Sequence, residues 1–333
     1  MTRFMNGNIV FGIAALCGAA CAVEPQAPPH IREQSIVQMQ ASGLQGFILQ
    51  GSLVQGMTMS GFRFAGATLN GSALSNFHLE NGELIGVQNG VTLRGATGLV
   101  NAHLFAEAEN KSAHQSAVIE YRITAIASEL TKYDPTSTGN TFLYSLEQNV
   151  DNTGTWSTAC PVDSDGRSAA IPLADTWDDK GDRNSSAMLF TLACTVSSIG
   201  DCYRWGYRPW VTGHGNLKIT HWACTRLARA DYCGDGQNHT LPGTLINVWD
   251  ELTPPIQAQG ATPDGMTFEA AWSQTGALCL SHTRWASSNG SVVAVECPNK
   301  LHPPGHGSPS VCDDPSQAGN GSNRLFNQSA INQ

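Results

Sequence analysis

Residues 216–240 read NLKITHWACTRLARADYCGDGQNHT and contain the clearest helical pattern in the chain. Asn216 is a residue type that caps helix N-termini, so we predict a helix over residues 216–231. One face of this helix is apolar at helical spacing, which favours packing against a core; it consists of Ile219, Trp222, Ala223, Leu227 and Ala230. The helix is expected to end at Gly234-Asp235-Gly236, where a glycine can adopt the left-handed cap conformation.

Segments on both sides of this helix are rich in β-branched and aromatic residues and predict strands. They cover residues 116–127, 141–146, 188–195, 244–249, 267–272 and 291–297. Together with the helix they predict a β-rich α+β domain over residues 108–301. Residues 302–333 are rich in Pro, Gly, Ser and Asn and are expected to be a flexible tail, with only Cys312 indicating that its first part is fixed.

The segment at the helix end resembles a known family. Residues 229–236, RADYCGDG, followed by His239-Thr240, are similar to the motif that names the bacterial ADYC-domain family. Two upstream blocks fit the same pattern, and the resemblance covers residues 117–301; the blocks are CYRWGYRPW at residues 202–210 and HWACTR at residues 221–226. Members of this family are exported and often lipoprotein-like. The resemblance therefore implies an exported domain and does not imply a reaction.

A five-residue period runs through the segment at residues 41–107. Glycine or asparagine recurs every five residues from Gly46 to Gly86, and an apolar residue recurs in the same frame from Leu49 to Leu84. This pattern resembles the pentapeptide-repeat family, which implies a right-handed β-helix. Eight repeats make only two coils, so we expect a short β-helical wedge packed on the disulfide-stapled α+β domain. The alternative is a low-complexity spacer with an accidental period.

Residues 1–22 have the order of a secretory signal peptide. Arg3 is their only charged residue, and the apolar run over residues 9–20 is shorter than the ~20 residues that span a bilayer. Two processing modes compete: release after this segment, or lipidation of Cys21 within a degenerate lipobox. Residues 23–40 are rich in proline and predict a linker like the tether that follows a lipidated cysteine. We expect an exported protein, either an outer-envelope lipoprotein or a secreted one.

Export makes disulfides the expected state of the cysteines, in preference to a zinc site. Eight cysteines follow the signal region: Cys160, Cys194, Cys202, Cys224, Cys233, Cys279, Cys297 and Cys312. Turn signals suggest that Cys279 and Cys297 share one face of a hairpin, and that Cys194 and Cys202 flank a turn.

The spacing of two cysteines on the predicted helix argues against a bond between them. A helix rises ~1.5 Å per residue, which places Cys224 and Cys233 roughly 13 Å apart, whereas a disulfide needs Cα atoms within about 7 Å. We therefore expect each to join the helix to a different segment, through Cys160, Cys312 or a hairpin cysteine.

Composition and motifs exclude several classes of function. The net charge is −9, which disfavours nucleic acid as a partner. The chain has no GxSxG, HExxH or phosphate-binding loop, so serine, zinc and nucleotide chemistry have no supporting motif. Asp163-Ser164-Asp165-Gly166 resembles a fragment of a calcium loop but lacks the bidentate glutamate, so a plain turn is the favoured interpretation. We expect no metal site and no cofactor.

Two function classes remain, and the first is a disulfide-stabilised binding or structural module. It would act on an envelope or extracellular ligand and would contact the membrane only through a lipid at Cys21. Its contact surface would be an aromatic cluster around a cation, although the same side chains can form core; the cluster consists of Trp205, Tyr207, Arg208 and Trp210.

The second class is an extracytoplasmic hydrolase. A thiol site needs a thiolate beside an imidazole that a third group orients, and these residue types are present: Cys233, His239, His221 and Asp231. Cys233 would sit at a helix C-terminus, where the helix dipole opposes a thiolate, so a disulfide is favoured there. Asp231 is then expected to act locally, through Arg226, Arg229 or backbone donors.

Overall fold

The computed structural model describes residues 36–38, 61–110, 115–130, 140–149, 154–178, 180–241, 243–285, 310–319 and 323–330. These residues form mainly antiparallel sheets and two helices of more than one turn, as predicted for a β-rich α+β chain. The predicted signal peptide, the lipidation site at Cys21, the first repeats and the predicted strand at residues 291–297 lie outside them.

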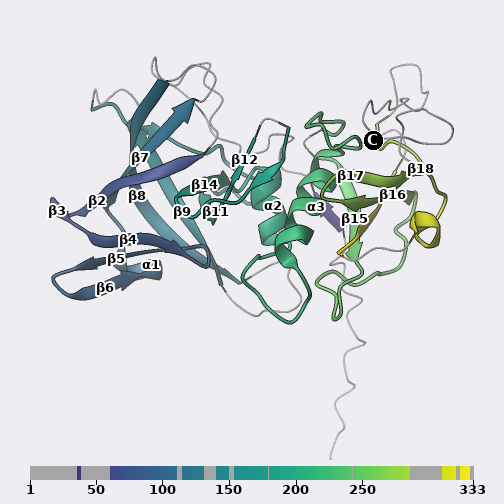
Figure 1. Cartoon of the computed structure of the whole chain (residues 1–333), viewed down its shortest axis with the longest axis horizontal. Helices are drawn as coiled ribbons and strands as arrows, with labels where there is room; N and C mark the ends of the chain where they lie inside the picture. Colours follow the sequence, from purple (N-terminus) through teal and green to yellow (C-terminus); the bar gives the residue numbers. More distant parts are fainter. Residues whose placement is uncertain are drawn as a thin grey trace, which may run out of the picture. The chain divides into compact units, whose positions relative to one another are not determined.

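Six antiparallel strands pair in a closed circuit (Figure 1). Each strand hydrogen-bonds to the next in the order β2 (Phe62–Leu69), β7 (Ala102–Asn110), β8 (Gln115–Leu130), β9 (Asn140–Asn149), β11 (Ala170–Ala174) and β14 (Leu189–Cys194). The circuit closes because β14 hydrogen-bonds to β2. Short strands β3 (Ser72–Ala73) and β10 (Ser157–Thr158) extend β2 and β9. Phe62, Tyr121 and Leu146 belong to the core that these strands share. The strands predicted over residues 116–127, 141–146 and 188–195 are confirmed.

The predicted β-helix is wrong for the described part of residues 41–107, which forms antiparallel hairpins. β4 (Ser75–Glu80), β5 (Glu83–Gln88) and β6 (Val91–Arg94) make a separate three-stranded sheet, followed by the one-turn helix α1 (Gly95–Gly98).

The turns explain why the five-residue period misleads. Asn-Gly pairs at residues 70–71, 81–82 and 89–90 connect the strands, with φ of 50–52° at asparagine and 76–79° at glycine. Asn-Gly favours tight hairpin turns with two positive φ values, so these glycines and asparagines mark chain reversals. The apolar column does reach the core, at Leu69 and Leu84 on strands and at Leu74 between β3 and β4.

A second sheet has the strand order β1 (Ile36–Gln38), β15 (Leu245–Asp250), β19 (Leu325–Ser329), β16 (Thr267–Ser273), β17 (Gly276–Leu280) and β18 (Ser310–Val311). Only the pair β17–β18 is parallel. The strands predicted at residues 244–249 and 267–272 are confirmed.

The expected linker and tail both contribute strands to this sheet. Ile36–Gln38 pair with β15 within the predicted linker. The expectation of a flexible tail is wrong for residues 325–329, which form the buried strand β19 between β15 and β16. Pro315–Ala318 form a single 3-10 turn. The apolar pair Leu325-Phe326 accounts for the burial of β19, since both side chains join cores of the second sheet.

Helix α3 (Leu217–Arg229) confirms the predicted helix and its cap, because Asn216 Oδ1 accepts the Ile219 amide at 3.3 Å. The helix ends earlier than expected. Its left-handed cap residue is Ala230, with φ 52°, and not a glycine of residues 234–236. The Ala230 side chain is buried in the core, and a glycine there would lose that packing. A shorter helix, α2 (Ser198–Arg204), precedes α3 in the chain. Before both helices, β12 (Thr176–Trp177) pairs with β13 (Arg183–Asn184).

Three disulfides join the described residues: Cys160–Cys194, Cys202–Cys224 and Cys279–Cys312, with Cα separations of 5.5–5.8 Å. Cys233 is also disulfide-bonded. Cys224 therefore pairs with a cysteine of α2 and not with Cys233, as predicted.

Both local pairings suggested by the sequence are wrong. Cys194 and Cys202 do not bond, because helix α2 occupies the segment expected to be a turn. Cys279 bonds Cys312 instead of Cys297, because β18 runs beside β17 and carries the chain to Cys312. The indication that Cys312 fixes the start of the tail is confirmed.

Within the described ranges, no helix has the length and apolarity needed to cross a membrane.

Two matched turn glycines test the hairpin assignment. Gly82 and Gly90 occupy equivalent turn positions with φ of 76° and 79°, but a Cβ on Gly82 would lie 2.4 Å from the Tyr203 hydroxyl and 2.6 Å from the Trp210 ring. A Cβ on Gly90 would meet nothing within 4 Å. Gly90→Ala should cost about 1–2 kcal/mol of backbone strain, and Gly82→Ala about 1–3 kcal/mol more. Chemical denaturation measures the difference, and equal losses would contradict the packing of this hairpin on Tyr203 and Trp210.

Candidate functional site

A buried ion pair lies between β16 and the residues that follow β17. Arg284 and Glu269 both have fully buried side chains. Arg284 Nε donates to both Glu269 oxygens at 3.1 Å, and Nη2 donates to Oε1 at 2.9 Å. Two charges removed from water are tolerated only when their remaining hydrogen-bonding groups are satisfied, so their other partners decide what this pair does.

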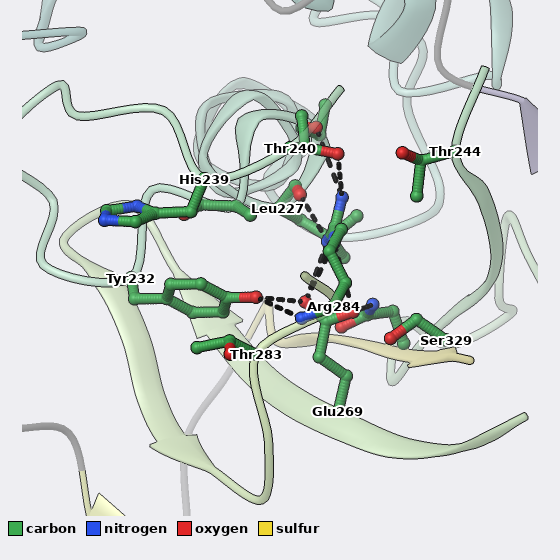
Figure 2. Close-up of polar contacts among 12 residues, drawn as sticks. Leu227, Tyr232, His239, Thr240, Thr244, Glu269, Thr283, Arg284 and Ser329 are labelled. Atoms are coloured by element: carbon green, nitrogen blue, oxygen red, sulfur yellow. Dashed lines mark hydrogen bonds and ion pairs between the residues drawn. The ribbon is translucent and has the colours of Figure 1, made fainter. Parts of the chain in front are cut away.

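The guanidinium of Arg284 also donates to the end of helix α3 and to the segment that follows it. Nη2 donates to Leu227 O at 2.9 Å, and Nη1 donates to Ala228 O at 3.4 Å and to Thr240 Oγ1 at 3.3 Å. Figure 2 shows Arg284 extending from Glu269 toward Leu227 and Thr240. The last carbonyls of a helix lack partners within the helix and carry partial negative charge. The guanidinium donates to two carbonyls of this last turn, of which Leu227 O also accepts the Ala230 amide at 3.0 Å, and thereby attaches α3 to the second sheet.

Tyr232 completes the network from the motif itself. Its hydroxyl donates to Glu269 Oε1 at 3.0 Å and accepts the Arg284 backbone amide at 3.1 Å. Its ring stacks on Trp272, with centroids 5.2 Å apart. Burial, followed by the nearby Glu269 charge, raises the pKa of Tyr232 well above its ordinary value. The tyrosine is therefore held as a neutral bridge.

Asn327 of β19 supports the same carboxylate at its other oxygen. Its Nδ2 donates to Glu269 Oε2 at 2.7 Å, and its Oδ1 accepts the Trp272 indole N–H at 2.8 Å. The network thus joins α3, β16, β19 and residues 282–285.

Asp231 closes the turn after the helix. Arg226 Nη1 donates to Asp231 Oδ2 at 2.5 Å, and the amides of Asp235 and Gly236 donate to the same carboxylate at 3.1 and 3.0 Å. This confirms the expectation that Asp231 acts locally through Arg226 and backbone donors.

Gly234 is the motif residue with the strictest steric requirement. Its φ is 68°, and a Cβ would lie 2.2 Å from Thr275 O. Any side chain at this position would collide with the turn between β16 and β17.

The candidate catalytic residues do not assemble into a thiol site. Cys233 is oxidised, so it carries no thiolate. His239 Nδ1 donates to Ala230 O at 3.0 Å, and its ring packs against Tyr232. His221 is fully buried elsewhere, between Trp177 and Tyr203, and donates through Nε2 to Ile199 O at 3.2 Å.

Three of the four residues of the suggested aromatic platform are buried: Trp205, Tyr207 and Arg208. The Tyr207 hydroxyl donates to Asp250 at 3.1 Å, and Trp205 O accepts from Gln257 at 2.7 Å. Trp210 is half-buried and packs on Tyr203 at 4.7 Å. These side chains form core instead of an exposed contact surface.

The fragment that resembles a calcium loop is a turn, as favoured from the sequence. Asp163 Oδ1 accepts the amides of Asp165 and Arg167. Both aspartates of this fragment pair with Arg204, Asp163 at 3.4 Å and Asp165 at 2.7 Å. Arg204 also contacts Glu129 at 2.9 Å. No cluster of three or more potential metal ligands occurs among the residues that the structure covers.

Residues 96–286 match the family profile described as the ADYC domain, which is more than half of the chain. The matched range contains α2, α3, Tyr232, Glu269 and Arg284, whereas β19 lies beyond it. No curated protein and no solved structure matches the chain.

Glu269→Gln tests the buried ion pair. The substitution leaves the Arg284 charge without its carboxylate, which should lower the free energy of unfolding by about 3–5 kcal/mol. The matched control is Glu251→Gln, because Glu251 pairs with Arg324 but is 37% exposed; its loss should be about 1 kcal/mol or less. Urea denaturation measures both. Similar losses for the two variants would contradict a structural role for the buried pair.

His221 should make stability depend on pH. Burial, followed by the Arg183 charge, lowers the pKa of His221 to about 3. The unfolded state, with a pKa near 6.5, binds the proton first, so stability should fall by up to about 5 kcal/mol as the pH drops from about 6.5 to about 3. His221→Gln keeps a donor for Ile199 O and should flatten this slope in unfolding experiments at several pH values. Burial also lowers the pKa of His282, so part of the slope should remain. An unchanged slope in the variant would contradict this role of His221.

Proposed function

This chain belongs to the ADYC-domain family, and on that premise we propose that it is an exported, disulfide-stabilised binding or structural module of the cell envelope. The single observation that carries the proposal is the use of the motif residues. Asp231, Tyr232 and Cys233 are all engaged in internal bonds, and Gly234 fits a sterically closed turn. The family motif therefore supports a scaffold role.

The disulfides support the proposed location. Disulfides persist in oxidising, extracytoplasmic compartments and are rare where thiols are kept reduced. Cys160–Cys194, Cys202–Cys224 and Cys279–Cys312 all have ordinary Cα separations. The signal-peptide pattern at residues 1–22 agrees with export, with either lipidation at Cys21 or release.

The hydrolase alternative receives less support. Its thiol form requires a free Cys233, which is oxidised. His282 Nε2 lies 3.2 Å from Ser329 Oγ, and a serine beside a histidine is a residue pair that hydrolases use. Ser329 is fully buried on β19 and His282 is nearly so, which favours a packing role for this pair.

Intact mass of the protein made with its own leader tests the proposal. The mature chain should begin at lipidated Cys21 or at Val23, and alkylation without reduction should label none of its eight later cysteines. After reduction, all eight should be labelled. Peptide mapping should give the three described bridges and pair Cys233 with the remaining Cys297. A chain that keeps Met1, stays in the cytoplasm and carries free thiols would contradict the proposal.

A further inference from the structure

An open pocket of about 430 Å³ lies on the closed sheet, between strands β8, β9, β10 and residues 166–169. Pockets of about 300–1,000 Å³ are typical of small-molecule sites. We infer that this pocket binds a neutral saccharide unit. The inference rests on the proposed function, because it names the class of ligand for a binding module.

The pocket lining is rich in residues that carry hydroxyls: Thr124, Ser145, Thr158 and Ser168. Its apolar residues offer little surface, because Leu143, Leu146 and Ala169 are only 1–3% exposed. A sugar carries a rim of hydroxyls that can donate to and accept from such side chains. A hydroxyl-rich lining therefore suits a saccharide better than an apolar ligand.

The charges that line the pocket already have partners. Glu147 accepts from Arg122 Nε at 3.0 Å, and Arg167 Nη1 donates to Glu129 at 2.5 Å. One acidic and one basic residue line the pocket, so their formal charges cancel. The lining therefore gives a charged ligand no net attraction, whereas a neutral ligand can hydrogen-bond to the exposed atoms of both side chains.

The backbone places a hydroxyl at the pocket by a local irregularity. The pairing of β8 with β9 shifts register between Ile123 and Ala125, which places Thr124 at a bulge. Bulges redirect side chains and occur often beside functional sites. Thr124 Oγ1 donates to Ser145 O at 3.2 Å, so its lone pairs remain able to accept a hydrogen bond.

The wall formed by residues 166–169 is held in place before any ligand binds. Asp163 fixes the turn that leads into it, and the Arg167 amide donates to that carboxylate at 2.8 Å. Ser168 Oγ donates to Cys160 O at 2.6 Å, and Cys160 is bonded to Cys194. A wall tied by a buried charge network and a disulfide loses little entropy on binding.

Trp156 does not line the pocket but packs on Arg122, which holds a lining residue. It directly precedes β10, which supplies Thr158, and its ring is half-buried. The Arg122 guanidinium lies 4.5 Å from the ring centroid, and Arg122 also holds Glu147 of the pocket wall. Trp156 is therefore a positioning residue, which supports Arg122 and through it Glu147.

Calorimetric titration with two soluble neutral probes tests the inference: cellotetraose and the N-acetylglucosamine tetrasaccharide. At least one probe should bind the full oxidised chain, and Thr158→Val should weaken binding about tenfold by removing one hydroxyl. Trp156→Ala should weaken binding less than Thr158→Val does, because Trp156 acts only through Arg122 and Glu147. The matched control is Thr92→Val, an exposed strand threonine on β6, which should leave affinity unchanged. Unaltered melting temperatures for both threonine variants show that folding is retained.

Three outcomes would overturn the inference: no binding of either probe, equal affinity of Thr158→Val and wild type, or binding of an acidic tetrasaccharide in preference to both neutral ones. These outcomes leave the proposed function standing if the intact mass shows an exported, fully oxidised chain. A reduced cytoplasmic chain would overturn the proposed function independently of saccharide binding.

Discussion

The rest of the structure around helix α3 depends on the buried ion pair between Arg284 and Glu269. Removing two charges from water is costly, and the pair is tolerated because nearly every hydrogen-bonding atom around it has a partner. Those partners come from segments far apart in the sequence: the last turn of α3, Tyr232, and Asn327 on β19. One interaction thus fixes helix α3 to the second sheet. Through Asn327 it also joins the central strand β19 to its neighbour β16.

This arrangement explains why a short motif can identify a whole domain without indicating a reaction. Asp231 closes the turn, Tyr232 bridges the ion pair, Cys233 is oxidised and Gly234 fits where no side chain can. Each residue type is required by geometry at the end of α3. Ligand binding is then expected away from the motif. The pocket on the closed sheet meets this expectation, because no motif residue lines it.

Elements that depend on local sequence patterns could be predicted, whereas elements that depend on contacts between distant segments could not. Helix α3 and the five strands β8, β9, β14, β15 and β16 followed from periodicity and β-branched residues. The five-residue period was misread because Gly71 and Asn81, which belong to its frame, are parts of Asn-Gly turns that reverse the chain. Glu269 could have been noticed as the one charge in the apolar strand TFEAAWS, but its partner Arg284 and the strand β19 depend on tertiary contacts. The bond between Cys279 and Cys312 depends on a parallel edge strand that local turn signals do not reveal.

Amide hydrogen exchange of Tyr232→Phe tests the central claim most directly. The substitution removes only the hydroxyl that joins Glu269 to the Arg284 amide, so the protein should remain folded while the network weakens. If the network holds α3 on the sheet, amides in Leu217–Arg229 and in Thr267–Ser273 should both exchange faster, by similar factors. Faster exchange confined to the residues beside Tyr232, with α3 and β16 unchanged, would contradict the account.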